Sequence, residues 1–117
     1  MTQDFPGANA TAVMKAYDLV RWLINHVGKF PRSHRYALGE RIEQRMLTVL
    51  EHLVRAAYVR EKKDPLTSAN SELQVLRLLV RLGRDLGFTS VSQYEFISRE
   101  LVDLGRQIGG WAKAQPN

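Results

Sequence analysis

The chain has 117 residues, of which 44% are hydrophobic and 25% charged, with a net charge of +5 and no cysteine. This balance predicts one globular domain over residues 1–117, and the missing cysteines exclude disulfides and thiolate metal sites. The first residues lack the basic and apolar regions of a signal peptide, and no apolar run approaches the ~18 residues of a membrane span, so we expect a cytoplasmic protein without a membrane partner.

The first two helices are predicted from apolar spacing and from the residues that interrupt it. A helix is expected over 10–27, because apolar side chains there follow the alternating four-three spacing of one helical stripe, and Gly28 ends it. A second helix is expected over 33–62, with Ser33 as its N-cap and Lys63-Asp64-Pro65 as a break after it. The stripe on the first helix comprises Val13, Tyr17, Val20, Ile24 and Val27.

Two more helices follow. Residues 66–70 are either a loop or an early turn, and a third helix is expected over 68–86, ending at Gly87. The fourth is expected over 92–108, ending at Gly109-Gly110. Its start carries a capping-box pattern and a hydrophobic staple, formed by Ser92 with Glu95 and by Val91 with Phe96. The short connections predict an all-α, up-down-up-down antiparallel four-helix bundle.

The apolar arcs of the second and third helices are wider than a bundle requires. Projected at about 100° per residue, the apolar side chains of the third helix fill about 180°, whereas a bundle helix needs little more than 100°. The surplus predicts self-association, and the alternative is a helix buried centrally in its own bundle.

Arginines lie beside these arcs. Arg77, Arg81 and Arg84 project within about 60° of one another, and Arg41, Arg45 and Arg55 fall with His52 within about 80°. Guanidinium groups match phosphate oxygens, so rows at one-turn spacing are typical of a surface that follows a nucleic-acid backbone. The alternative is a solvated face partly neutralised by Glu40, Glu51 and Asp85.

The segment from Lys29 to Tyr36 adds further basic residues and two aromatic ones. Lys29, Arg32 and Arg35 are candidate phosphate contacts, and the rings of Phe30 and Tyr36 could stack on bases. For the two aromatic rings we favour docking onto the end of the bundle, and the charges leave both interpretations open.

Two side chains on other faces are unusual. Trp22 projects onto the polar face of the first helix, which suggests contact with another subunit or a partner, the alternative being packing under a terminus or loop. Glu43 projects inside the apolar arc of the second helix. If buried, its carboxylate needs an arginine partner; otherwise it reaches solvent past the bundle end.

No pattern indicates an enzyme or a bound cofactor. His26, His34 and His52 share no metal-ligand spacing with carboxylates, and the chain has neither a phosphate-cradling glycine loop nor a nucleophile elbow. We therefore expect a non-catalytic protein without metal or cofactor.

Three segments carry a resemblance to a known family. They occur in this order along the chain: Lys29-Phe-Pro-Arg-Ser-His-Arg-Tyr-Ala-Leu-Gly-Glu-Arg-Ile42, then Leu76-Arg-Leu-Leu-Val-Arg-Leu-Gly-Arg-Asp-Leu-Gly-Phe88, then Tyr94-Glu-Phe with Leu104-Gly-Arg-Gln-Ile-Gly-Gly-Trp111. Together they resemble the four-helix-bundle family of the diversity-generating retroelement accessory variability protein and the 23S ribosomal RNA intervening-sequence protein.

The resemblance implies a homopentameric barrel that binds RNA or DNA and a reverse transcriptase. The arginines that match it are Arg41, Arg45, Arg77, Arg81 and Arg84. The alternative is a protein–protein adaptor or structural oligomer of the intervening-sequence type. The full set of expected nucleic-acid contacts is Lys29, Arg32, Arg35, Arg41, Arg45, Arg55, Arg77, Arg81 and Arg84.

Overall fold

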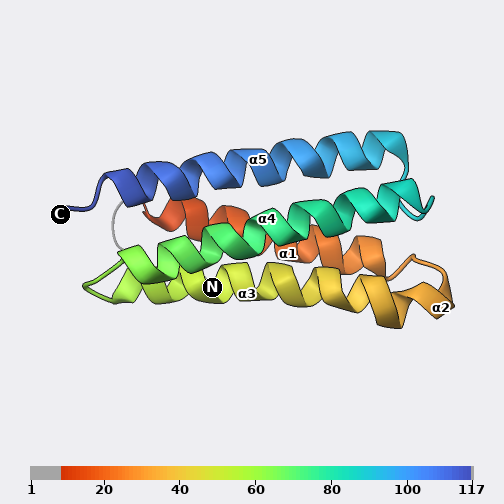
Figure 1. Cartoon of the computed structure of the whole chain (residues 1–117), viewed down its shortest axis with the longest axis horizontal. Helices are drawn as coiled ribbons and strands as arrows, with labels where there is room; N and C mark the ends of the chain where they lie inside the picture. The colour runs from red at the N-terminus through yellow and green to blue at the C-terminus, as the bar shows by residue number, and fades with distance from the viewer. Residues whose placement is uncertain (1–8, 117) are drawn as a thin grey trace.

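The computed structural model describes residues 9–116, and within that range it contains helices and no strand. The four long helices are α1 (Asn9–Val27), α3 (Glu40–Tyr58), α4 (Lys63–Asp85) and α5 (Val91–Lys113). Successive long helices run in opposite directions along the 45 Å axis of the molecule (Figure 1). This arrangement is the expected antiparallel bundle. None of the described helices is both long and apolar enough to cross a bilayer.

The helices form a four-sided bundle in which α1 contacts α3 and α5, while α4 contacts α3 and α5. The core lies between them and includes Leu23, Met46, Leu76 and Leu101, all 1% exposed or less. The stripe predicted for α1 is only partly right. Val13, Val20 and Val27 are buried, but Tyr17 and Ile24 remain 47% and 42% exposed. Those two lie at the edge of the buried arc, whose centre is formed by Ala12, Ala16, Leu19 and Leu23.

The predicted helix over 33–62 is wrong at both ends. It begins with a short α2 (Arg32–His34), whose N-cap is Pro31, and continues through the π-helical turn η1 (Arg35–Gly39) into α3. The side chain of Ser33 makes no cap. At the other end α3 stops at Tyr58, and the Lys62 ammonium donates to the carbonyls of Ala56 and Val59 at 2.7 and 2.8 Å. A lysine that binds the last carbonyls of a helix stabilises its C-terminus.

The expected break at Lys63-Asp64-Pro65 is the first turn of α4. Proline is tolerated there because the first amides of a helix have no intrahelical acceptor. The ambiguous residues 66–70 are therefore helical. The end of α4 follows the prediction closely: Gly87 has a φ of 84°, and the amides of Gly87 and Phe88 donate to the carbonyls of Arg84 and Gly83. This is a Schellman C-cap.

The start and end of α5 both differ from the prediction. Its capping box is Ser90 with Gln93, two residues before the expected pair, and Val91 is 65% exposed and so forms no staple. The helix continues through Gly109-Gly110 to Lys113. Burial of Trp111, 7% exposed, holds the last turns against the bundle in spite of the two glycines.

Candidate nucleic-acid interface

The three arginines of α4 share one side of the bundle, facing the groove between α4 and α5. Arg77 and Arg81 line a hollow of about 320 Å³ there with Tyr94. Arg84 donates to Asp85 at 2.8 and 3.1 Å, and its guanidinium lies 4.8 Å from the centroid of the Tyr94 ring. Arg81 is 4.0 Å from the same aspartate. The predicted grouping is present, but Asp85 already occupies part of its hydrogen-bonding capacity.

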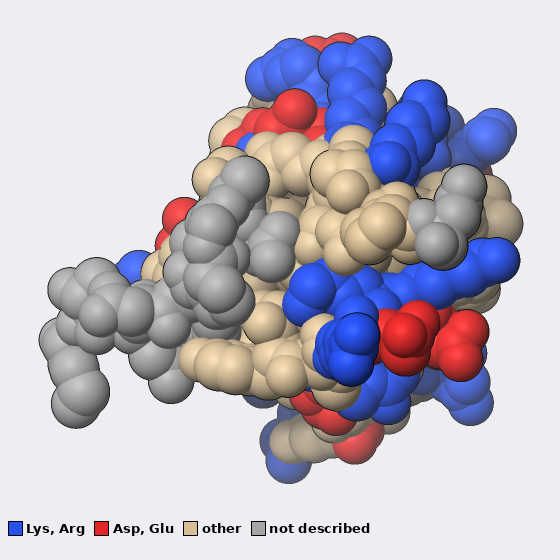
Figure 2. All heavy atoms as spheres, turned by 90° about the vertical axis from the view of Figure 1, so that its left-hand side faces the viewer, with Lys and Arg blue, Asp and Glu red and all other residues tan. Residues whose placement is uncertain are grey.

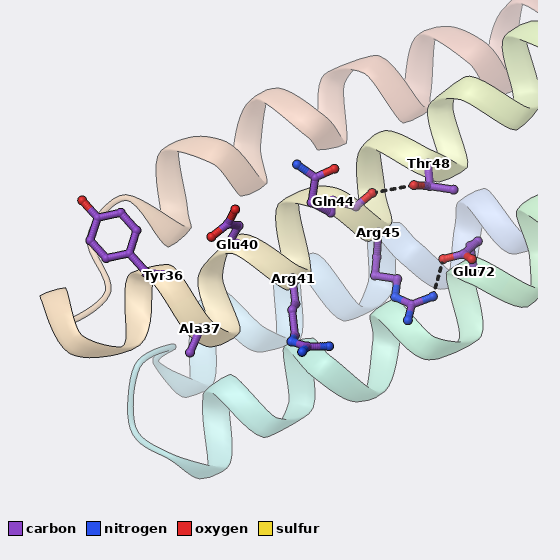
Figure 3. Close-up of a pocket in the computed structure, with 8 residues that line it drawn as sticks. All are labelled: Tyr36, Ala37, Glu40, Arg41, Gln44, Arg45, Thr48 and Glu72. Atoms are coloured by element: carbon purple, nitrogen blue, oxygen red, sulfur yellow. Dashed lines mark hydrogen bonds and ion pairs between the residues drawn. The ribbon is translucent and has the colours of Figure 1, made fainter.

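Two of the three predicted arginines of α3 extend toward α4, whereas Arg55, in the last turn of α3, is exposed and forms no ion pair with a carboxylate of residues 9–116. Figure 3 shows Arg41 and Arg45 reaching toward α4, whereas Glu40 and Gln44 point away from it. The guanidinium of Arg45 donates to Glu72 of α4 at 2.8 Å, which ties the two helices together. Arg41 has no ion pair with any carboxylate of residues 9–116, so its donors remain available. The surrounding hollow has a volume of about 480 Å³.

The segment between α1 and α3 carries the most accessible charges. Lys29, Arg32 and Arg35 are all exposed, and none of them pairs with a carboxylate of the described chain. The aromatic residues divide: Phe30 is 2% exposed and packs in the core as expected, while Tyr36 is 68% exposed. The expectation that Tyr36 docks onto the bundle is therefore wrong. This end of the molecule presents three unpaired cations and one exposed ring.

A group of aromatic rings lies where α1 packs against the start of α5. The Trp22 ring stacks on His26 with centroids 4.7 Å apart and lies 5.4 Å from the Phe96 ring. Trp22 is therefore half-buried where α1 packs against α5, and it packs on a helix of its own bundle instead of under a terminus or loop. His26 shares a 2.8 Å hydrogen bond with the Thr89 hydroxyl, and burial, with Lys29 nearby, lowers the pKa of His26 below its ordinary value.

A second set of basic residues was not predicted as a site. Arg60, Lys62 and Lys63 line a hollow at the opposite end of the bundle, where α3 connects to α4 and α5 ends. Figure 2 views this end and shows Lys and Arg side chains gathered around it, with Asp and Glu among them. The signal available in the sequence was the dense charge of residues 60–64, which also includes Glu61 and Asp64. Because Lys62 is engaged in capping α3, this set is less available than the one at the other end.

Glu43 lies half-buried on α3 and forms no ion pair with any residue of 9–116. Burial and the neighbouring Glu40 carboxylate raise its pKa. The arginine partner that a buried carboxylate would require is therefore not supplied by the described part of its own chain.

The described residues contain no cluster of three or more His, Cys, Asp or Glu side chains that could hold a metal ion. No curated protein matches the chain. The model of the bAvd-like family matches residues 11–115, nearly its whole length. The chain therefore belongs to the bAvd-like family, which is named for the accessory variability protein of diversity-generating retroelements.

Proposed function

We propose that this protein is a non-catalytic, oligomeric accessory factor that binds RNA or DNA and acts with the reverse transcriptase of a diversity-generating retroelement. The observation that carries the proposal is the family match over residues 11–115, combined with unpaired cations at one end of the bundle. In that family the accessory protein serves a retroelement, and the exposed guanidinium groups supply donors suited to phosphate oxygens.

The expected contacts differ in availability. Lys29, Arg32 and Arg35 are the primary candidates at one end of the bundle. Arg41, near the start of α3, and Arg55, in its last turn, are added because all five are exposed and unpaired within the described range. The remaining four already interact with neighbouring side chains and are proposed as secondary contacts: Arg45, Arg77, Arg81 and Arg84.

We further propose that the bundle assembles into a homopentameric ring, as the family resemblance implies, and that it acts in the cytoplasm. Support comes from apolar side chains that the single chain leaves in solvent, among them Leu78 at 66% and Leu86 at 51% exposure. Five copies at +5 each carry +25, which would strengthen attraction to a polyanion well beyond that of one chain.

Salt titration of RNA and DNA binding tests the nucleic-acid proposal. Phosphate contacts release counterions, so affinity should fall steeply and linearly on a logarithmic scale as salt rises. No binding at low salt, or binding indifferent to salt, would refute it. Replacing Arg77, Arg81 and Arg84 together would show whether the secondary contacts take part.

A second candidate is a protein–protein adaptor or structural oligomer of the intervening-sequence type. It is favoured by the exposed apolar residues of α4, which suit a protein surface better than a phosphate backbone. Capture of a purified reverse transcriptase together with failure to bind any nucleic acid would support the adaptor.

A further inference from the structure

The outer face of α4 is apolar at its centre and cationic at its borders. Its centre, here called the α4 strip, is Val75, Leu78, Leu82 and Leu86, which are between 39% and 66% exposed. Arg41 and Arg45 reach toward α4 from the α3 side (Figure 3), and Arg77 and Arg81 lie on the α5 side. The carboxylates near these arginines are Glu72 and Asp85. An apolar centre with a polar rim is typical of a protein–protein interface.

A second apolar surface lies along α1 and α3, and its charges have the opposite sign. Its apolar members, here called the α1–α3 face, are exposed or half-buried: Met14, Tyr17, Ile24, Leu47, Leu50 and Val54. Glu43 projects among them on α3, at about 100° per residue, with Glu40 and Glu51 on the outer border. Among the described residues of α1 and α3, Arg21 is the basic side chain that projects onto this face.

The two surfaces complement each other better than either complements itself. Joining two α1–α3 faces would place Glu43 against another acidic face, and joining two α4 strips would place two arginine rims together. Both arrangements are unfavourable because they bring like charges together. Joining one face to one strip buries apolar surface on both sides and provides a guanidinium for the unpaired carboxylate.

We propose that copies of this chain associate head to tail, with the α1–α3 face of one copy packed on the α4 strip of the next and Glu43 paired with an arginine of its rim. The proposal rests on the self-association in the proposed function and identifies the surfaces that form each junction. Since α3 borders both surfaces, the two surfaces lie on neighbouring sides of the bundle. Each copy is then rotated relative to the one before it, and successive copies follow a curved path. A turning head-to-tail assembly can close into a ring.

The proposal also divides the basic residues into two sets. The arginines beside the α4 strip would meet the next copy, whereas Lys29, Arg32 and Arg35, at the bundle end, would stay in solvent. In this arrangement Arg41, Arg45, Arg77 and Arg81 serve the junction and leave the set of proposed nucleic-acid contacts. Assembly would then depend on these four arginines and nucleic-acid binding on Lys29, Arg32 and Arg35, so the two can be tested separately.

Complementation between two variants tests the pairing of surfaces. Leu82→Glu places a charge on the α4 strip, and Ile24→Glu places one on the α1–α3 face; both positions are more than 40% exposed. Val91→Glu is the matched control, because Val91 is 65% exposed and belongs to neither surface. Leu78→Glu and Tyr17→Glu serve as second variants should either of the first pair lose its helical circular dichroism.

Light scattering at micromolar concentration should give an oligomer for the wild type and for Val91→Glu. Each of the two surface variants should be a monomer of 13.4 kDa. An equimolar mixture of them retains one intact junction and should form a dimer of twice that mass. Glu43→Lys should also weaken assembly, whereas Glu43→Gln should weaken it less.

Several results would overturn the proposal. These are a monomeric wild type, a surface variant that keeps the wild-type mass, a mixture that stays monomeric, or a wild type that assembles only when a reverse transcriptase is added. Salt-titrated RNA binding by the same samples separates the two proposals. An assembled wild type that binds no nucleic acid would refute the proposed function and leave the junction standing.

Discussion

Removing two cations from the end of the bundle should reduce both the affinity for nucleic acid and its dependence on salt. The change is Arg32→Gln with Arg35→Gln in one chain. Both side chains are exposed and form no ion pair with a carboxylate of residues 9–116, so the substitutions remove no ion pair within the described chain. Surface substitutions of this kind usually change the free energy of unfolding by no more than about 0.5 kcal/mol.

The size of the effect follows from counterion release. Each lost phosphate contact lowers the slope of log K against log salt by about 0.7 for single strands and about 0.9 for duplex DNA, so two contacts lower it by about 1.4 to 1.8. Between 50 and 200 mM salt the wild type should therefore lose roughly tenfold more affinity than the variant. The change in slope and the tenfold difference in affinity apply to each subunit that contacts the nucleic acid.

Fluorescence anisotropy with labelled RNA at several salt concentrations measures this slope. The matched control is Arg99→Gln with Arg106→Gln, which removes the same charge from exposed positions of α5. An equal loss of slope in both variants would show that only net charge matters, and an unchanged slope in the first would remove Arg32 and Arg35 from the site. Either result refutes the reasoning.

Four further predictions concern stability, measured by urea unfolding. Gly87→Ala should lower the free energy of unfolding by roughly 1–2 kcal/mol, because φ is 84° there. Gly109→Ala should raise it by about 0.5–1 kcal/mol, because the position is helical and the new methyl group meets no atom within 4 Å. Trp111→Ala should lower it by about 3–5 kcal/mol, and Trp111→Phe should lower it by less, since the buried indole N–H has no acceptor among the described residues and the phenyl ring keeps part of the packing. The pKa of His26 is lowered in the folded state, so the unfolded chain binds the proton more readily. The contribution of neutral His26 to the free energy of unfolding is therefore complete above pH 6.5 and is lost as pH falls below that value. His26→Gln should remove this dependence, and a pH dependence identical to that of the wild type would contradict the assignment.

The helices were predictable because their periodicity reflects burial directly. A side chain that faces the core recurs at helical spacing, and the four long helices appear where that spacing occurs. The wide arc on the third predicted helix includes Leu82 and Leu86, which the single chain leaves exposed.

Helix boundaries were less predictable because local signals competed. Ser90 with Gln93 and Ser92 with Glu95 both satisfy the capping-box pattern, and only the structure distinguishes them. Pro65 is typical of a break between helices, but proline is equally compatible with the first turn of a helix, which is where it lies. Such choices depend on tertiary packing, which a local pattern does not contain.

For the candidate site, projection placed the arginines on common faces but could not reveal their partners. Glu72 is 27 residues from Arg45, and their 2.8 Å ion pair arises only when α3 and α4 pack together. The surroundings of Trp22 also depend on packing between helices. Trp22 projects to the polar side of α1, yet α5 covers that side, and Phe96 packs against the ring.

The distinction between paired and unpaired arginines changes how the basic character of this chain should be understood. A net charge of +5 on one chain is modest, and several of its arginines are held by Glu72 or Asp85. In the proposed ring, the strip arginines would be used at the junctions, where carboxylates of the next copy meet them. The cations left for a polyanion would be those at the bundle ends, repeated once per copy at similar height around the ring. Their spacing around the ring, more than the total charge, would then determine the nucleic acid that fits.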